Sequence, residues 1–305
     1  MQSLLDDVIA RNRQWTQKGK VADYIPALST ANSDALGICV TDVNGQEWAA
    51  GDARTFFSIQ SIVKAVTLLC ALEDAPIRSI AKVISFEVCS DSFDSIANLE
   101  TSRSHKPLNP LINSGAIAII PFISGKAYEE KFLRVVKLIR QMTRNQSIEV
   151  NDKVYKSETL TGNRNRALAY YMKSTGTLSG DVEEVLDIYF RLCSIEVTCH
   201  DIARIGAVLA GDGLMPGTGE AVANPNSCRI VKAMMSTCGM YNESGAFATS
   251  TGIPAKSGVG GGIMAAIPGK MGIGVVGPAL NSKGNSVAGI RVLSDLSSKL
   301  KLSIY

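Results

Sequence analysis

Residues that commonly hold metal ions are scarce in this sequence of 305 residues. It has only two histidines, His105 and His200, and its seven cysteines include no Cys-x-x-Cys pair. Because structural zinc sites need clustered cysteine and histidine ligands at short spacings, the pattern predicts no metal site. We expect the cysteines to be reduced and to pack as small buried hydrophobes.

Signals for export or membrane insertion are also lacking. Residues 1–15 carry two aspartates and two arginines and no basic stretch followed by an apolar core, so we expect no signal peptide and a cytoplasmic protein. Residues 258–280 contain one charged side chain, Lys270, but glycines and prolines interrupt them, with Pro268-Gly269-Lys270 at the centre. These interruptions by glycine and proline predict two strands joined by a tight turn instead of a membrane-spanning helix.

A strong surplus of one charge is absent too. Lysine and arginine number 31 against 28 acidic residues, and the net charge of +3 argues against the clustered basic face of a nucleic-acid-binding protein. The densest basic stretch, within residues 131–144, is interleaved with apolar residues, so we interpret it as the solvated face of an amphipathic helix. Hydrophobic content of 46% against 19% charged residues predicts a folded chain with a sizeable core.

Strand patterns occur near both ends of the chain. Residues 37–41 and 47–49 flank Asn44-Gly45, the strongest local signal for a β-hairpin. Three later segments have strand character, and they are residues 246–253, 262–267 and 271–276. The hairpin and these segments would form an antiparallel sheet of about five strands, a usual size.

Helical patterns fill most of the rest. Apolar residues recur at helical spacing in residues 3–18, 128–143, 164–174, 181–194, 198–211, 228–238 and 285–300. Residues 147–161 are polar and irregular. We therefore predict an α/β (α+β) fold in which residues 1–75 and 220–305 form a sheet-containing domain and residues 76–219 a mainly helical insertion domain.

The segment 58–72 is apolar on nearly every face, as expected of a buried helix. It nevertheless contains Ser61 and Lys64 in Ser-x-x-Lys spacing, which places both side chains on one face of a helix. A serine needs an adjacent base to act as a nucleophile, and a buried lysine can be that base because desolvation lowers its pKa. Ser-x-x-Lys alone is common on helix surfaces, but here the lysine would be buried without another role.

A second motif, Lys256-Ser257-Gly258, begins a glycine-rich strand. Such a strand lets backbone N–H groups approach a reacting carbonyl, as an oxyanion hole requires. Lys-[Ser/Thr]-Gly also accompanies Ser-x-x-Lys in penicillin-recognising serine enzymes. A phosphate site is the weaker interpretation, because no G-x-x-x-x-G-K-[ST] is present. Together the motifs predict a catalytic serine on a helix beside a strand at the edge of a sheet.

Longer blocks of the sequence resemble the serine-dependent glutaminases. The blocks are residues 24–26, 57–64, 109–116, 189–196, 236–241 and the segment that begins at residue 255. The resemblance extends from about residue 21 to residue 305, nearly the whole chain. It implies a β-lactamase-like (transpeptidase-like) fold, hydrolysis of L-glutamine to L-glutamate and ammonia without a cofactor, and a homo-oligomer, either dimer or tetramer.

The resemblance also implies roles for single residues. Ser61 matches the nucleophile, Lys64 its base, and Tyr241 a proton relay. Val259 matches the residue whose backbone N–H shares the oxyanion hole with that of Ser61. The glutamine-binding positions are Tyr24, Ser61, Asn113, Glu158, Asn165, Tyr189, Tyr241 and Val259, with Lys256 and Gln60 in support. A buried carboxylate such as Glu158 suits the α-ammonium of glutamine, and amides and phenols suit its α-carboxylate.

Other interpretations stay open from the residues alone. By pattern, Tyr189 is a core residue, Asn113 and Asn165 are caps or turns, Tyr241 is a loop residue and Glu158 a solvated acid. A penicillin-binding or β-lactamase-like hydrolase is a rival function, which the missing export signal disfavours. A catalytically silent scaffold is another, which the presence of both motifs disfavours. Residues 87–95 resemble the family's P-S-G-x-x-F-N-S region without its proline and glycine, and Val63 replaces a common serine.

Overall fold

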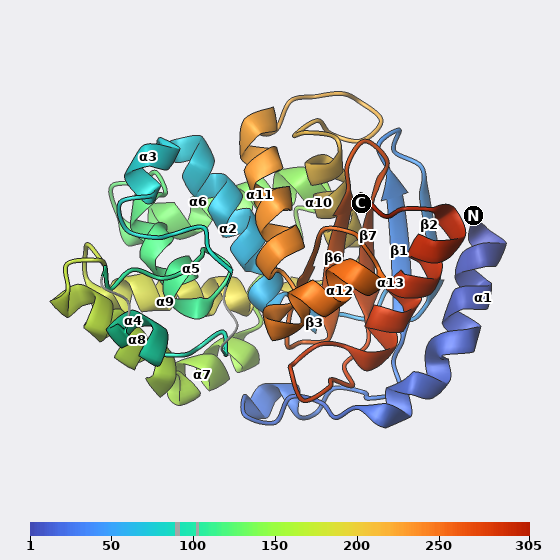
Figure 1. Ribbon diagram of the computed structural model, residues 1–305, viewed down its shortest axis with the longest axis horizontal. Coiled ribbons are helices and arrows are strands. Elements are labelled where there is room, and N and C mark those ends of the chain that lie inside the picture. Colours follow the sequence, from blue (N-terminus) through green and yellow to red (C-terminus); the bar gives the residue numbers. More distant parts are fainter. Residues whose placement is uncertain (89–91, 102–103) are drawn as a thin grey trace.

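An antiparallel sheet occupies one half of the molecule (Figure 1). The computed structural model describes residues 1–88, 92–101 and 104–305. The strands of the sheet follow the order β2-β1-β7-β6-β5. They are β1 Gly37–Asp42, β2 Glu47–Gly51, β5 Ala255–Ser257, β6 Gly262–Ile267 and β7 Met271–Val276. Two further short strands, β3 Phe57–Ser58 and β4 Glu196–Val197, pair with each other apart from this sheet.

Helices cover the sheet and form the other half of the molecule. The α-helices are α1 Gln2–Asn12, α2 Val63–Asp74, α3 Ile77–Ile80, α4 Ala97–Thr101, α5 Asn113–Ile119, α6 Tyr128–Thr143, α7 Asp152–Thr161, α8 Asn163–Ser174, α9 Val182–Cys193, α10 Cys199–Ala210, α11 Pro225–Cys238, α12 Ser244–Ser250 and α13 Val287–Leu300. The short 3₁₀ helices are η1 Arg13–Lys18, η2 Pro26–Leu28, η3 Gln60–Ile62, η4 Ile120–Phe122 and η5 Tyr241–Glu243. Among the described residues, no helix is long and apolar enough to span a bilayer.

The two faces of the sheet carry side chains of different size. Along β7, Ile273 and Val275 point to one face and pack with apolar residues of α1 and α13. Gly272 and Gly274 alternate with them and face α10. A Cβ atom on Gly272 would lie 2.0 Å from the backbone nitrogen of Ala207 in α10. The glycines therefore allow α10 to lie directly against the sheet, while α1 and α13 cover the opposite face (Figure 1).

Helix α2 connects the sheet to the helical half of the molecule. It packs against α5, α6 and α11, and its residues from Val63 to Ala71 are all buried. Residues of α2, α6, α9 and α10 belong to one continuous apolar core. Helix α10 falls within the predicted insertion, residues 76–219, yet it packs on β1, β6 and β7. The division of the chain into two domains stays a prediction.

The predicted antiparallel sheet of five strands is confirmed, as are the hairpin of β1 and β2, the turn between β6 and β7, and the buried helix that contains Lys64. Two predictions were wrong. Residues 246–253 are mostly the helix α12, and the fifth strand is β5 instead. Residues 147–161 include the helix α7. The described cysteines are buried thiols, as expected, and Cys89 lies outside the described residues.

Candidate active site

Ser61 lies in η3, the short turn that leads into α2. Ser61 is 7% exposed, and Lys64, in the first turn of α2, is 1% exposed. The backbone N–H of Ile59 donates to the carbonyl of Ile195 at 2.7 Å, next to the ladder of β3 and β4. Gln60 has a φ of +48°, in the left-handed region that few residues other than glycine adopt. The turn that presents Ser61 is therefore held in an unusual conformation by its surroundings.

A chain of polar contacts leads from Lys64 to two asparagines. The Nζ atom of Lys64 donates to Oδ1 of Asn113 at 2.5 Å, and Nδ2 of Asn113 donates to Oδ1 of Asn165 at 2.8 Å. Burial lowers the pKa of Lys64 to about 8, although nearby acidic groups such as Glu158 partly oppose this effect. Part of the Lys64 population is therefore neutral near physiological pH and able to accept a proton.

The two sequence motifs meet at Tyr241. The Nζ atom of Lys256 lies 4.5 Å from the centroid of the Tyr241 ring and donates to the carbonyl of Ser257 at 2.6 Å. Burial lowers the pKa of Lys256, and the charge of Lys64 lowers it further. Burial raises the pKa of Tyr241, whereas the neighbouring Ser61 hydroxyl lowers it. The Tyr241 hydroxyl finds no partner of standard hydrogen-bond geometry within the described part of the chain.

The glycine-rich loop after β5 lies directly against the turn that carries Ser61. A Cβ atom on Gly258 would lie 2.8 Å from the carbonyl oxygen of Ile59, and one on Gly260 would lie 2.5 Å from that of Ser58. Val259 between them is 5% exposed. Because glycine has no Cβ, the backbone around Val259 can approach the backbone around Ser61.

A cavity of about 310 Å³ contains most of the predicted site residues. Those on its wall are Tyr24, Gln60, Ser61, Asn113, Glu158, Asn165, Tyr189 and Val259. Lys64 reaches it through its hydrogen bond to Asn113, while Tyr241 lies beside Ser61 and Lys256 beside Tyr241. Tyr24 is 55% exposed, so it stands at the mouth of the cavity, while Tyr189 is buried.

Glu158 is the acidic group most deeply placed in this cavity. It lies on α7 and is 6% exposed. Burial raises its pKa to about 7, and a hydrogen bond from Gln60 and the charge of Lys64 limit the rise. Burial also raises the pKa of Tyr189, whose ring remains a neutral hydrogen-bonding group. The cavity thus offers an ionisable carboxylate to a cation and neutral amides and a phenol to an anion.

Several residues on the wall of the cavity were not predicted, among them Phe93 and Cys193. The ring of Phe93 lies 4.8 Å from that of Tyr241, and Nζ of Lys64 lies 5.8 Å from its centroid. Cys193 is on the wall of the cavity, and burial raises the pKa of its thiol to about 12. Phe93 lies in the segment 87–95, whose resemblance to a family motif could have indicated that it belongs to the site. Residues 89–91 of this segment lie outside the described residues.

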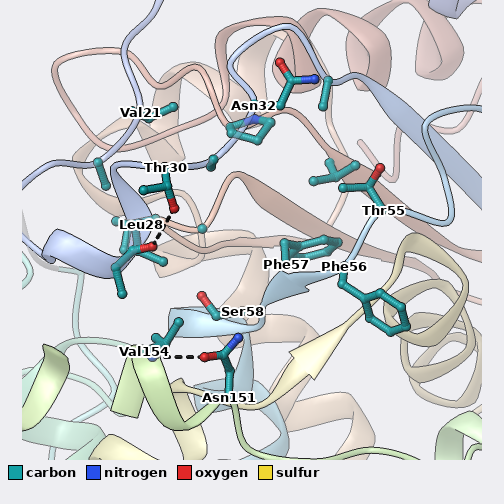
Figure 2. A pocket seen from close by; sticks show the side chains of 18 of the residues that line it. Val21, Leu28, Thr30, Asn32, Thr55, Phe56, Phe57, Ser58, Asn151 and Val154 are labelled. Atoms are coloured by element: carbon teal, nitrogen blue, oxygen red, sulfur yellow. Dashed lines mark hydrogen bonds between the residues drawn. The ribbon is translucent and has the colours of Figure 1, made fainter. Parts of the chain in front are cut away.

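A smaller cavity of about 220 Å³ also has Val259 on its wall; Figure 2 shows this cavity. Thr30, Ser58 and Asn151 are among its polar residues, and Phe57 is among its apolar ones. Asn151 caps α7 by accepting a hydrogen bond from the backbone of Val154 at 3.1 Å. Ser61 does not line this cavity, so the larger one is the candidate active site.

One cluster resembles a set of metal ligands. Ligand atoms of Cys39, Glu47 and His200 lie within 4.8 Å of one another. Arg204 donates to Glu47 at 2.9 Å, and Nδ1 of His200 lies 2.6 Å from the same carboxylate. Although burial opposes the effect, hydrogen bonds from His200 and Arg204 lower the pKa of Glu47 to about 2. An ion-pair network between β1, β2 and α10 accounts for this cluster.

Comparisons with known proteins point to one family. A family model described as "Glutaminase" matches residues 19–305. A glutaminase of Clostridium botulinum is 52% identical over 305 residues, which is all of both chains, and one of Clostridium tetani is 51% identical over the same length. A Bacillus subtilis glutaminase has been solved as the covalent complex formed by its reaction with 6-diazo-5-oxo-L-norleucine. It is 36% identical to this chain and superposes with a TM-score of 0.91, and the match covers 100% of this chain and 99% of that one.

Proposed function

The chain belongs to the glutaminase family and hydrolyses the side-chain amide of L-glutamine to L-glutamate and ammonia, and from this premise we propose that Ser61 is the nucleophile. Ser61 lines the larger cavity, and Lys64 follows it by one helical turn. The Bacillus relative forms a covalent complex with a glutamine-like diazo ketone, as an enzyme with a nucleophile would. This observation carries the proposal, because it implies a covalent step in the family.

Lys64 acts as the base in the proposed first step. In its neutral form it accepts the Ser61 proton, either directly or through Tyr241, as the Ser61 oxygen attacks the side-chain carbonyl carbon. The lowered pKa of Lys64 supports this role, since a lysine with an ordinary pKa would be almost wholly protonated at pH 7. Lys256, whose own pKa is lowered by burial and by the charge of Lys64, supports the relay from its position beside the Tyr241 ring.

The negative charge that develops on the carbonyl oxygen is bound by two backbone N–H groups, those of Ser61 and Val259. The close approach that Gly258 and Gly260 permit supports this assignment. Removing one such donor in other hydrolases costs about 3–4 kcal/mol of transition-state stabilisation. Ammonia then leaves with a proton that Lys64 and Tyr241 return, and water releases glutamate from the acyl-enzyme.

Residues on the wall of the cavity orient the substrate. We assign Glu158 to the α-ammonium, because an ionised buried carboxylate strongly favours a cation beside it. The α-carboxylate is assigned to Asn113, Asn165 and Tyr189, which are neutral donors. Tyr24 covers the substrate at the mouth, and Gln60 keeps Glu158 in place by hydrogen bonding.

Release of ammonia from glutamine by purified wild type and Ser61→Ala tests the proposal. The wild type should turn over glutamine, and the variant should lose about a thousandfold or more of kcat, because the covalent step is lost. Retention of activity within about tenfold of wild type would remove Ser61 from the nucleophile role. An inactive wild type would favour the silent scaffold, and hydrolysis of a β-lactam without glutamine turnover would favour the penicillin-recognising alternative.

Assembly and location are further proposals. The family resemblance supports a homo-oligomer, either dimer or tetramer. The buried cysteine thiols support the reducing environment of the cytoplasm. Sedimentation of the purified protein and fractionation of cells that express it test the two proposals.

A further inference from the structure

An open groove of about 960 Å³ adjoins the reaction cavity. Residues 17–24 form one wall and residues 280–284 the other. Tyr24, Phe93 and Val259 line both the groove and the reaction cavity, so the two spaces meet at these side chains. The groove has about three times the volume of the cavity, far more space than an ammonia molecule needs to leave.

The groove opens at the end of the site where the amide nitrogen must lie. A Cβ atom on Gly284, in the groove wall, would lie 3.5 Å from the ring of Tyr241 and 3.5 Å from the side chain of Val259. Tyr241 and Val259 are the groups assigned to the leaving nitrogen and the carbonyl oxygen. By contrast, Glu158 and Tyr189, which are assigned to the α-carbon end, line the cavity but not the groove.

The groove has a surplus of positive charge. Its charged side chains are Lys18, Lys20 and Lys283 against Asp23. All three lysines are exposed, and none forms an ion pair with another described residue. Because the lysines flank one path away from Tyr241, an anionic group on the leaving nitrogen would be attracted along that path.

We propose that the groove receives a substituent on the side-chain amide nitrogen of the substrate. The protein would then also hydrolyse γ-glutamyl dipeptides, whose second residue ends in a carboxylate. This inference rests on the roles proposed above for Ser61, Tyr241 and Val259. Ser61 Oγ forms a bond to the γ-carbonyl carbon, the bond from that carbon to nitrogen breaks, and the nitrogen takes the proton from Ser61. The free amino acid leaves through the groove, and one water molecule then releases glutamate and restores the hydroxyl.

The first experiment compares three substrates with the wild-type protein. Values of kcat/KM are measured for L-glutamine, for γ-L-glutamylglycine, and for the neutral γ-L-glutamylethylamide, with Ser61→Ala as the blank for contaminating hydrolases. We expect both substituted amides to be hydrolysed, and γ-glutamylglycine to be preferred over the ethylamide by roughly threefold to tenfold at low salt. The preference should shrink as NaCl is added, because salt screens exposed charges.

The second experiment removes the positive charge. The triple variant Lys18→Ala, Lys20→Ala, Lys283→Ala should lower the ratio of kcat/KM for γ-glutamylglycine to that for the ethylamide by roughly threefold to tenfold. Lys299→Ala, an exposed lysine in the last turn of α13, is the control and should leave the ratio unchanged.

Three results would overturn the inference. Turnover of glutamine with no hydrolysis of either substituted amide would mean that the groove takes no substituent, while the glutaminase function stands. Equal hydrolysis of both amides, unaffected by the lysine substitutions or by salt, would remove the preference for an anion. Failure to turn over glutamine as well would contradict the proposed function together with the inference.

Discussion

Two buried ionisable residues govern how the site should respond to pH. Burial lowers the pKa of Lys64 and raises that of Glu158, and both pKa values move toward neutrality. Lys64 must be neutral to accept a proton, and burial favours this form. Glu158 must be ionised to pair with the α-ammonium, and burial disfavours this form. Both requirements are met more fully as pH rises, so the reaction should have an acidic limb.

The variant Lys64→Arg tests whether Lys64 acts as a base or only through its positive charge. Arginine keeps the charge and cannot be deprotonated in a protein, so we expect no activity from pH 6 to 10. In the wild type, kcat/KM should rise with pH toward a plateau, with an apparent pKa near 8 that belongs to the coupled group of Lys64, Tyr241 and Lys256. A Lys64→Arg protein with the wild-type profile would show that the base lies elsewhere.

Glu158→Gln should act on substrate binding. Loss of the carboxylate removes the charge partner of the α-ammonium, and we expect KM for glutamine to rise by roughly 30-fold or more at pH 8. The fall of KM with rising pH that the ionisation of Glu158 produces in the wild type should disappear in the variant. N-acetylglutamine, which lacks the ammonium, should be a poor substrate of the wild type; if it is hydrolysed as well as glutamine, the role of Glu158 is wrong.

The same substitution should stabilise the fold at alkaline pH. The folded-state pKa of Glu158, about 7, is above its ordinary value of 4.5, so the folded protein binds more protons between these values than the unfolded chain does. The stability from this group is therefore full below pH 4.5 and is lost as pH rises through 7. Thermal unfolding at pH 5 and pH 8 should show Glu158→Gln gaining on the wild type by about 1–3 kcal/mol at pH 8 only. An equal difference at both values would contradict this.

At the scale of secondary-structure elements, glycines set the distance between α10 and the sheet. Gly272 in β7 and Gly206 in α10 both lie where the two elements meet. A Cβ atom on Gly206 would lie 2.4 Å from the carbonyl oxygen of Ala265 in β6. Since the obstructing atoms are backbone, no side-chain rotation can make room, and the elements themselves would have to separate.

Gly272→Ala tests this contact. We expect it to destabilise the protein by about 1–3 kcal/mol, as overpacking of a core does. Gly245→Ala is the matched control, because Gly245 lies in α12 with no atom within 4 Å of the new Cβ. Alanine at a helical site should be neutral or stabilising by about 0.5–1 kcal/mol. Unfolding midpoints in urea measure both, and an unaffected Gly272→Ala would mean that α10 adjusts without cost.

Periodicity failed to identify two helices, α7 and α12, for different reasons. Helix α7 buries Val154, Ser157 and Glu158 on one side. Two of the three are polar, because Glu158 lines the substrate cavity and the Ser157 hydroxyl accepts a hydrogen bond from the backbone N–H of Ala27 at 3.2 Å. A search for apolar residues at helical spacing therefore misses this helix. Residues 246–253 alternate small and β-branched side chains and suggested a strand, whereas α12 buries only Ser244 and Phe247 and faces solvent elsewhere. Segments with strong periodicity, such as α6 and β6, were located correctly.

At the scale of the whole molecule, the site is assembled from distant parts of the chain. Ser61 and Lys64 come from the segment after the first hairpin, Glu158 from the helical half, and Lys256 from the edge strand of the sheet. The motif order predicted that the first and last of these would meet. The position of α10 on the sheet, and that of Phe93 close to both Lys64 and Tyr241, depend on long-range packing, which no local pattern records.

The most direct test of the central claim, that Ser61 is the nucleophile, is to map the covalent product of 6-diazo-5-oxo-L-norleucine. The diazo ketone should lose dinitrogen and leave 5-oxo-L-norleucine on the Ser61 oxygen, as one adduct per chain found by mass spectrometry of proteolytic peptides. Glutamine should protect against labelling, and Ser61→Ala should not be labelled. An adduct on another residue, such as Cys193, that persists in Ser61→Ala together with glutamine turnover would contradict the account.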